Sequence, residues 1–519
     1  MSHELPLPLL TRAEEGGLRF VLSPTGPAPK AESTLRMPTR PPGPGEQYRF
    51  HFDMGKCIGC KCCVVACNEQ NGNPAAINWR RVGHIEGGFY PHAHRSYLSM
   101  GCNHCVEPTC MSGCPVDAFT KDPATGVVLH SADTCIGCQY CTWNCSYGVP
   151  QYNPERGVVG KCDLCHSRLA DNQAPACVSA CPSGAIQVEI VNVAEWKAAI
   201  AATPLAPSAF GVPGLPSGDQ SISTTRITLP KTLPPDARPV ELVRLELSEA
   251  HWSLIIMTTL TQLSVGTLTT VWLLHLLGVR AALGATALTS VLVGGLALAA
   301  STLHLGRPVH AYRALRAWRR SWLSREVLLF AAFSVVACAY AAALWLSLPG
   351  SAGIGAWTAA LGLGGITASA YIYRVPSRPS WNTPFTLVHF HLTAATLGPL
   401  LAAAVGAGDP RLLGVAAATV AGAQLVTLAL RFFRLTAADS VELRASGRLL
   451  ATVLSSRLLA RGVLLALGAI ALPLYTTHPA VLWTAFLAAL AGEVLGRYLF
   501  FVSAVPKHMV APYLGSEAA

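Results

Sequence analysis

Cysteines dominate the part of the sequence that could carry chemistry. All but one of the 18 cysteines lie between positions 57 and 181. Sixteen of them form four runs: Cys57-x2-Cys60-x2-Cys63-x3-Cys67, Cys102-x2-Cys105-x4-Cys110-x3-Cys114, Cys135-x2-Cys138-x2-Cys141-x3-Cys145 and Cys162-x2-Cys165-x11-Cys177-x3-Cys181. Zinc sites use two separated C-x2-C pairs. Closely spaced thiolates followed by one more are instead typical of a run that holds [4Fe–4S] clusters.

The geometry of such a run implies that clusters come in pairs. A tight loop can wrap one cubane with three thiolates, and the short helix that follows carries the fourth thiolate toward a neighbouring cluster. Sixteen ligands therefore predict four [4Fe–4S] clusters. Two cysteines are left over, and we expect Cys62 to be a small buried side chain and Cys338 to pack within an apolar run.

The two halves of the chain differ in composition. Residues 1–250 hold 20 Lys and Arg and 22 Asp and Glu, whereas residues 251–519 hold 18 basic and six acidic residues. The basic residues of the second half stand between long apolar runs, which argues against nucleic-acid binding. A membrane core of about 30 Å takes about 20 helical residues. Eight runs are long enough: 253–277, 281–303, 326–348, 354–373, 385–407, 412–433, 458–477 and 480–503.

These observations predict an α+β ferredoxin-like domain with several clusters, followed by an all-α transmembrane bundle of eight helices. Pro-rich and Gly-rich stretches mark the expected boundaries. The expected parts are an extended or disordered segment over 1–48, the cluster domain over 49–195, an extended linker over 196–248, the membrane domain over 249–505 and a tail over 506–519.

Loop charges predict the orientation, because Lys and Arg favour the cytoplasmic side. The loops after spans 2, 4 and 6 lie on the side of the cluster domain. The densest basic group follows span 2: Arg307, Arg313, Arg316, Arg319, Arg320 and Arg325. Only Arg280 and Arg411 lie on the opposite side. We predict a multi-pass protein of the bacterial inner membrane with its clusters in the cytoplasm, where cysteines are metal ligands rather than disulfides.

The N-terminus is consistent with this orientation, because it shows no basic region before an apolar stretch and no twin arginine. The alternative is a cluster domain on the periplasmic side, exported together with a partner that carries its own signal.

Five stretches resemble the iron–sulfur subunit of the dimethyl sulfoxide reductase group, the electron-transfer partners of molybdopterin enzymes. They are CIGCKCCVVACNEQNG, INWRRVGHIEGG, GCNHCVEPTCMSGCPVDAF, CIGCQYCTWNCSYGVPQYN and KCDLCHSR…ACVSACPSGAI. The resemblance implies a nested pairing of the first run with the fourth and of the second with the third. It implies these ligand sets: Cys57, Cys60, Cys63 and Cys181; Cys67, Cys162, Cys165 and Cys177; Cys102, Cys105, Cys110 and Cys145; Cys114, Cys135, Cys138 and Cys141.

The second half resembles the eight-span anchor subunit of the same group. The stretches that carry this resemblance are HWSLIIMTTLTQLSVG, STLHLGRPVHAYRAL, SWLSREVL, PSWNTPFT and AGEVLGRYLFF. In that group the anchor is usually a separate chain, so the protein resembles a fusion of two subunits.

His304 is the first candidate for a quinone site. It ends span 2 on the cluster side, and an imidazole that titrates near neutral pH can accept a proton from a quinol hydroxyl. Arg307 could hold a quinone oxygen or a nearby carboxylate. The resemblance also places the matching histidine in the menaquinol site of the anchor subunit. The alternative for His304 is a helix-end histidine bonded to a carbonyl.

Other polar residues of the second half have structural interpretations. We expect an ion pair between Arg325 and Glu326 and another between Glu493 and Arg497, which are four residues apart on one helix. His389 and His391 are weaker quinone candidates. The second half of the chain contains no CxxCH motif and no convincing pair of histidines on two helices, so we predict no haem.

The favoured function is that of an electron-transfer and membrane-anchor subunit, without catalytic residues of its own, in a molybdopterin-dependent quinone oxidoreductase. Its quinone would be menaquinone or ubiquinone. No region is large enough for the molybdenum cofactor, which implies a separate catalytic subunit. The direction stays open between an S-oxide-type reductase and a sulfite-type dehydrogenase. The alternatives are a stand-alone quinone–ferredoxin oxidoreductase and a transporter-like module whose clusters sense or gate.

Overall fold

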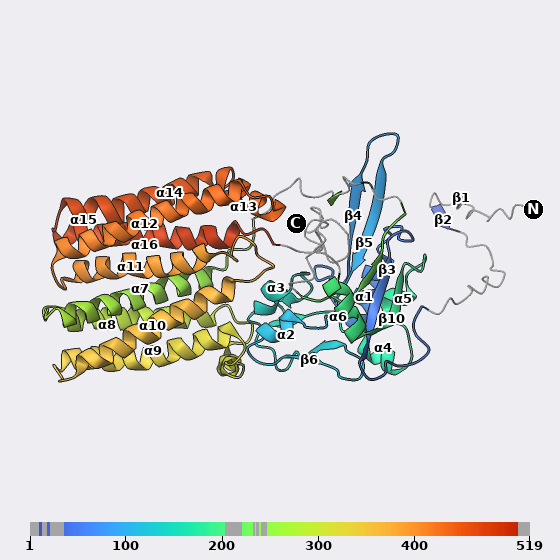
Figure 1. Ribbon diagram of the computed structural model, residues 1–519, viewed down its shortest axis with the longest axis horizontal. Coiled ribbons are helices and arrows are strands. Elements are labelled where there is room, and N and C mark those ends of the chain that lie inside the picture. Colours follow the sequence, from blue (N-terminus) through green and yellow to red (C-terminus); the bar gives the residue numbers. More distant parts are fainter. Residues whose placement is uncertain are drawn as a thin grey trace, which may run out of the picture.

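The computed structural model describes residues 36–202, 221–231 and 247–506, together with residue 234 and short strands at 10–12, 18–20 and 238–239. Most of the segment expected over 1–48, much of the linker and nearly all of the tail lie outside these residues. Figure 1 shows two parts, a bundle of long helices and a domain of short strands and helices at one end of the bundle.

A three-stranded sheet joins the beginning of the cluster domain to its end. Strand β3 (Glu46–Asp53) alternates buried and partly exposed residues, as expected for a strand with one covered face. It pairs antiparallel with β10 (Ile186–Asn192) and parallel with β11 (Arg226–Thr228). This pairing brings the first cysteine run, just after β3, next to the last cysteine, just before β10.

Short elements fill the rest of the cluster domain. The other strands are β1 (Leu10–Arg12), β2 (Leu18–Phe20), β4 (Arg81–Gly87), β5 (His94–Met100), β6 (Phe119–Lys121), β7 (Val128–His130), β8 (Gln151–Asn153), β9 (Val158–Gly160) and β12 (Arg238–Pro239). The helices are α1 (Cys62–Asn71), α2 (Thr109–Gly113), α3 (Tyr140–Asn144), α4 (His166–Ala170), α5 (Ala176–Ser179) and α6 (Val193–Ala202). Helix α1 packs against α5, and α2 packs against α3.

Part of the expected linker packs against the cluster domain. The hydroxyl of Thr224 donates to the carbonyl of Asn103 at 2.7 Å, and the hydroxyl of Thr225 donates to the Asn103 side chain at 2.6 Å. Tyr147 donates to the carbonyl of Ser221 at 2.6 Å. Residues 221–231 therefore cover the second cysteine run.

Seven helical segments in the described part of the chain are long and apolar enough to cross a membrane. They are α7 (Trp252–Leu276), α8 (Leu283–Thr302), α9 (Trp322–Trp345), α11 (Pro384–Val405), α12 (Pro410–Thr436), the segment Ser455–Tyr475 and α16 (Pro479–Val502). The segment Ser455–Tyr475 comprises α14 (Ser455–Leu465), the π-helical turn η2 (Ala466–Ala471) and α15 (Leu472–Tyr475). Helix α10 (Ser351–Tyr373) is similar in length and is rich in Gly, Ala, Ser and Thr. Two shorter elements, η1 (Pro308–Leu315) and α13 (Val441–Ala451), lie in the connections.

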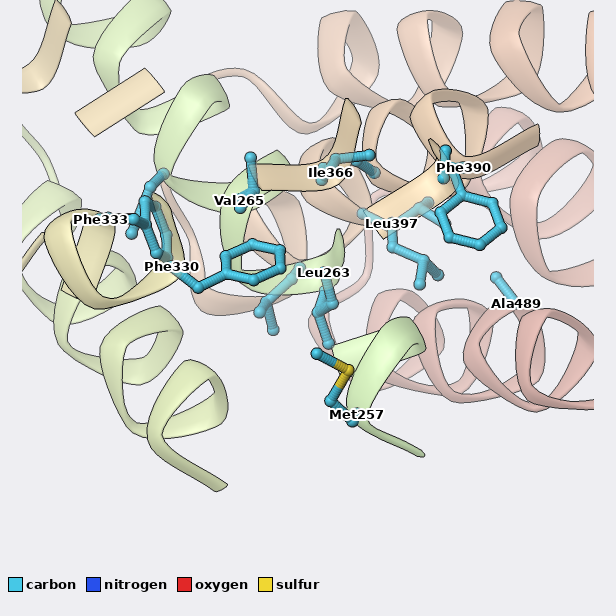
Figure 2. Packing of buried hydrophobic residues seen from close by; sticks show 14 of the residues in the cluster. Met257, Leu263, Val265, Phe330, Phe333, Ile366, Phe390, Leu397 and Ala489 are labelled. Carbon is cyan, nitrogen blue, oxygen red and sulfur yellow. The ribbon is translucent and has the colours of Figure 1, made fainter. Parts of the chain in front are cut away.

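Helix α7 is the centre of the bundle, and it packs against α8, α10, α11 and α16. Small residues let it approach α11 closely, because a Cβ at Gly266 would overlap the backbone of Ala394, and a Cβ at Gly398 would overlap the backbone of Gly266. Figure 2 shows the resulting core, in which side chains from α7, α9, α10 and α11 form one cluster, among them Met257, Phe330, Ile366 and Phe390.

The loop between α8 and α9 fastens the bundle to the cluster domain. The amide of Arg307 donates to the carbonyl of Ile136 at 3.1 Å, and the hydroxyl of Ser321 donates to the carbonyl of Gly113 at 2.8 Å. Arg320 forms an ion pair with Asp117. The connection after span 2 therefore lies on the side of the cluster domain, as predicted.

Candidate redox centres

The structure gathers the sixteen run cysteines into four groups, within which the thiol charges act on one another. Group I contains Cys57, Cys60, Cys63 and Cys181. Group II contains Cys67, Cys162, Cys165 and Cys177. Group III contains Cys102, Cys105, Cys110 and Cys145. Group IV contains Cys114, Cys135, Cys138 and Cys141. Each group therefore combines cysteines from two runs, the first with the fourth or the second with the third, as the resemblance to the iron–sulfur subunit implies.

Burial controls the acidity of these thiols. The pKa of Cys57 is raised to about 11, mainly by burial and to a smaller extent by the neighbouring thiolates of group I, while the backbone amide of Gly59 opposes the rise. In the same way, burial first and neighbouring thiolates second raise the pKa of Cys105 and of Cys138 to about 12. Such thiols become ligands when a bound metal stabilises the thiolate.

Four thiols are the donor number of a [4Fe–4S] cluster and also of a tetrahedral zinc ion. In a tetrahedral zinc site with Zn–S bonds of about 2.3 Å, the sulfur atoms lie about 3.8 Å apart. Among the described residues, no three His, Cys, Asp or Glu side chains come together closely enough to share one ion. The four thiols of each group are close enough for their charges to interact, and those of group III line a small cavity of about 20 Å³.

Contacts between groups place them in a row. Cys177 of group II interacts with Cys63 of group I, and Cys162 of group II interacts with Cys102 of group III. Cys141 of group IV interacts with Cys110 of group III. The order along the domain is therefore I, II, III, IV, with group I far from the membrane bundle and group IV against it.

Three basic side chains, which the cysteine pattern does not reveal, lie buried between the groups: Arg80, His104 and Lys161. Burial alone would lower the pKa of Arg80, but thiolates of groups I and II raise it above the ordinary value. The Nδ1 atom of His104 accepts from the amide of Val128 at 3.1 Å, and its Nε2 atom lies 4.0 Å from the sulfur of Cys162. Arg80 and His104 stand inside stretches of the quoted motifs, INWRRVGHIEGG and GCNHC, which is the signal that could have identified them.

A cavity of about 300 Å³ lies where group IV meets the membrane bundle. The cluster domain contributes Ile136, Cys138 and Trp143 to its walls. The bundle contributes Leu254, Met257, Leu298, Ser301, Thr302, His304, Leu305, Ala311, Tyr312, Ala314, Leu315, Leu323, Glu326, Val327, Phe330, Ala331, Ile372 and Tyr373. The walls are apolar except for a few convergent polar groups, which is the usual character of a site for an organic ligand.

His304 is one of these polar groups, and it lies just beyond the end of α8. Its Nδ1 atom is shielded from solvent and has no hydrogen-bond partner among the described residues. Burial lowers the pKa of His304 to about 4, partly opposed by the carbonyl of Ser301. At neutral pH the imidazole is therefore uncharged and able to accept a proton.

Glu326 is a second polar group of the cavity, and its assignment to an ion pair with Arg325 was wrong. Arg325 instead donates to the carbonyl of Trp318 at 3.1 Å and to that of Arg319 at 2.6 Å. Glu326 is only 7% exposed and lines the cavity. Adjacent residues on a helix point in different directions, so neighbours in sequence are poor candidates for a pair.

The other candidates lie away from the cavity. Arg307 does not line it, and its guanidinium group instead donates to the carbonyl of Ala132 in the cluster domain at 2.8 Å. His391 bonds to the carbonyl of Leu387 and to Thr367. His389 lines a separate small cavity deeper among α11, α12, α14 and α16.

The expected pair between Glu493 and Arg497 is also absent from the described residues. Glu493 accepts from Thr393 at 2.9 Å and from Gln424 at 2.6 Å, while Arg497 donates to Gln262 at 2.8 Å. The partners come from other helices, which the spacing of two residues on one helix cannot reveal.

Cys62 was expected to be buried and Cys338 to pack within an apolar run, and both are exposed. Cys62 begins α1 on the outer side of group I. Cys338 lies on the outward face of α9.

A second cavity of about 300 Å³ lies on the other side of Trp143. It is more polar, and its walls include Glu249, His251 and Arg378. The rings of Trp143 and His251 are 5.3 Å apart. Trp143 thus forms a wall between the apolar cavity and the polar one.

Comparisons with known proteins cover both parts of the chain. Residues 93–191 match the 4Fe-4S dicluster domain, and residues 248–502 match the DMSO reductase anchor subunit family. An anaerobic dimethyl sulfoxide reductase chain from Haemophilus influenzae is 36% identical over 181 residues, which are 33% of this chain and 88% of the relative.

The chain belongs to the dimethyl sulfoxide reductase family of electron-transfer subunits. It is a fused subunit, with the iron–sulfur part and the anchor part in one polypeptide. A probable anaerobic dimethyl sulfoxide reductase chain from Escherichia coli is 40% identical over 149 residues, 27% of this chain and 72% of the relative. A sulfite dehydrogenase subunit from Allochromatium vinosum is 36% identical over 160 residues, 27% of this chain and 67% of the relative.

The thiol groups of the fused subunit fit iron–sulfur clusters of the [4Fe–4S] type. Each group supplies four thiols from two runs, the donor set that such a cluster requires, and most of these thiols are buried. The dicluster match begins at residue 93, so the first run lies outside it, but the contacts of Cys63 and Cys67 place that run in the same row.

We expect replacement of Arg80 by glutamine to lower the reduction potentials of the clusters nearest to it. A buried positive charge favours the reduced, more negative form, and its removal should shift the potentials of groups I and II by on the order of 50 mV. Redox titration followed by electron paramagnetic resonance would measure the shift. The matched control is Arg81→Gln, and equal shifts in both variants would contradict the role of Arg80.

Proposed function

We propose that the fused subunit carries electrons between a quinone in the apolar cavity and a separate molybdopterin-containing catalytic subunit, through four [4Fe–4S] clusters. The proposal covers both directions of flow, because the similar proteins include a dimethyl sulfoxide reductase chain and a sulfite dehydrogenase subunit. Menaquinone and ubiquinone are both compatible with an apolar cavity of this size.

One observation carries the proposal, namely that Cys138 of group IV and His304 line the same cavity. A ligand in that cavity lies against the end of the row of thiol groups, and a [4Fe–4S] cluster takes up or releases one electron at a time. The cavity is bounded by membrane helices and the cluster domain, so a lipid-soluble carrier can reach it from the bilayer.

Two side chains in the cavity can handle the protons of a quinol. His304 is uncharged at neutral pH, and its unpartnered Nδ1 can accept a proton from a hydroxyl group. Glu326 offers a second acceptor or hydrogen-bond partner at membrane depth, where an acidic residue is a functional candidate. Beyond Trp143, His251 and Glu249 in the polar cavity supply the next proton-binding groups toward the outside.

The catalytic partner is proposed to bind near group I, at the opposite end of the row. Cys60 is the exposed member of that group. Beside it, Ile58 is 62% exposed and Val65 is 60% exposed, which makes an apolar patch around the outermost thiols. Large exposed apolar side chains that gather in one place mark a protein interface.

The membrane arrangement is part of the same proposal. Helix α10 packs against α7, α9 and α11 and is proposed as the eighth span. We retain the domain boundaries over 1–48, 49–195, 196–248, 249–505 and 506–519 as proposals. The charge distribution of the loops supports a cytoplasmic cluster domain, although Arg307, Arg313 and Arg320 of the densest group also bind the cluster domain itself.

Purification of the native complex tests the function. We expect about sixteen iron atoms, as much acid-labile sulfide and about one molybdenum atom per chain, together with a larger catalytic polypeptide. A complex with full iron content and quinone activity but without molybdenum would support the stand-alone quinone–ferredoxin oxidoreductase instead. Oxidation of added quinol by a sulfoxide, or reduction of quinone by sulfite, would set the direction.

We expect replacement of Glu326 by glutamine to slow electron exchange with quinols by about 10- to 100-fold, because the amide keeps the shape of the carboxylate and cannot accept a proton. The rate of cluster reduction by a quinol in stopped flow would measure this. Glu442→Gln on α13, outside the cavity, is the matched control, and a Glu326→Gln variant with the wild-type rate would remove Glu326 from the site.

A further inference from the structure

Three arginines lie buried together inside the membrane bundle, away from the apolar cavity that is proposed to bind quinone and is called the quinone cavity below. They are Arg431 of α12, Arg461 of α14 and Arg497 of α16, and each is no more than 8% exposed. His389 of α11 and Glu493 of α16 lie beside them. We call these five residues the arginine chamber.

The chamber carries more positive than negative charge. Glu493 is its single carboxylate, and both oxygens of that carboxylate already accept from neutral donors, Thr393 and Gln424. Among the described residues none of the three guanidinium groups forms an ion pair with Glu493. Three arginines and one carboxylate leave two positive charges uncompensated in a low-dielectric region, where an unpaired charge is costly.

Several donors in the chamber have no partner. The Nε–H groups of Arg431 and Arg461 are buried without a hydrogen bond among the described residues, and so is the ring N–H of His389, whichever of its nitrogens carries the proton. Arg431 donates weakly to the carbonyl of Ser380 at 3.4 Å, and Arg497 lies 3.8 Å from the centroid of the Phe390 ring. Buried donors are normally satisfied, so these nitrogens point to an acceptor that the described residues do not themselves supply.

The space in the chamber limits the size of that acceptor. Two adjoining cavities of about 20 Å³ each share Arg431, Arg461, Gly496 and Phe500 among their walls. A cavity of about 10 to 15 Å³ holds one water molecule. Each cavity therefore has room for a particle of about the size of a water molecule or a halide ion, and neither holds a phospholipid headgroup.

Helix α16 is shaped to hold one of the arginines in place. A Cβ at Gly496 would overlap the guanidinium group of Arg461, so only glycine lets that group lie against the helix backbone. The absence of a side chain at this position leaves room for the guanidinium group of Arg461, a residue that lines both cavities.

We infer that the arginine chamber binds one small inorganic anion of the size of chloride. The anion would accept from the unpartnered nitrogens of Arg431 and Arg461 and neutralise part of the excess charge. This site would hold α12, α14 and α16 together at the end of the bundle that faces the cluster domain. The inference is independent of quinone chemistry, because the chamber and the quinone cavity share no lining residue.

Equilibrium dialysis of the purified full-length protein against radioactive chloride tests the inference. We expect about one chloride per chain and a thermal unfolding midpoint that is about 3 °C higher in chloride than in gluconate at the same ionic strength. Arg461→Gln should weaken chloride binding at least tenfold. Arg457→Gln, which removes an exposed arginine one turn earlier on α14, should bind as the wild type does.

Two further experiments test the anion site if the Arg461→Gln variant does not fold. Gly496→Ala keeps every charge but takes the space of the Arg461 guanidinium group, so it should also weaken binding. Bromide exchanged into crystals should give an anomalous peak between Arg431 and Arg461. Wild-type protein that retains no chloride, or a chamber that holds a water molecule or lipid phosphate and no bromide, would overturn the proposal.

Discussion

The His304→Gln variant is expected to lose electron exchange with quinols by about 100-fold or more, while its iron content and cluster spectra stay unchanged. Glutamine is similar in size and polarity to histidine but cannot take up a proton. Because burial lowers the pKa of His304 to about 4, the wild-type imidazole is already uncharged between pH 5 and 8. This group should therefore limit the rate only as the pH falls toward 4, where the imidazole becomes protonated and can no longer accept.

The measurement is the rate at which a soluble quinol reduces the clusters, followed by their visible absorbance. The matched control is His391→Gln, since His391 lies near the same end of the bundle but bonds to Leu387 and Thr367 outside the cavity. Reduction by dithionite should be the same in all three proteins. A His304→Gln variant that is reduced by quinol at the wild-type rate would remove the imidazole from the proposed site.

The local spacing of cysteines predicts more of this protein than any other feature of its sequence. Cluster ligation depends on loops of a few residues, so the pattern C-x2-C-x2-C-x3-C nearly determines the local geometry. The row of groups needs one further condition, the pairing of β3 with β10, which brings Cys181 back to Cys57. The apolar runs similarly predict the long helices, because the bilayer imposes one length on all of them.

Pairing between polar side chains is much harder to predict. Arg325 and Glu326 are adjacent, and Glu493 and Arg497 are one turn apart, yet none of these pairs forms. Glu493 of α16 bonds instead to Thr393 of α11 and Gln424 of α12, two neighbours that depend on how three helices pack. The same reason applies to Arg307, whose partner is a carbonyl group in the other domain.

Burial of single residues is hard to predict for the same reason. Free cysteine is a residue type that is usually buried. Cys62 is nevertheless exposed, because α1 directs Cys63 and Cys67 toward groups I and II and turns Cys62 outward. Glu326 shows the opposite difference between prediction and structure. A glutamate is usually exposed, but the position of Glu326 on α9 places it in a cavity between the two domains. The α8–α9 loop, which docks on the cluster domain, contributes several residues to the walls of that cavity.

Replacement of Cys114 by serine tests both the nested pairing and the position of group IV. Cys110 and Cys114 belong to one run, but they lie in groups III and IV respectively. We expect Cys114→Ser to lose up to about four iron atoms and the cluster signal that responds to quinone-site inhibitors. Quinol should then no longer reduce the remaining clusters, although dithionite still does, because the cluster beside the cavity is the entry point.

Two matched variants decide between the pairings. Cys110→Ser should alter a different cluster signal, one that does not respond to ligands in the quinone cavity, because group III has no residue in its walls. Cys62→Ser should keep all of the iron, since Cys57, Cys60, Cys63 and Cys181 already supply four thiols to group I and Cys62 is an exposed fifth thiol beside Cys60. If Cys110→Ser and Cys114→Ser altered the same signal, the run would hold a single cluster, and the arrangement of two runs around each cluster would be wrong.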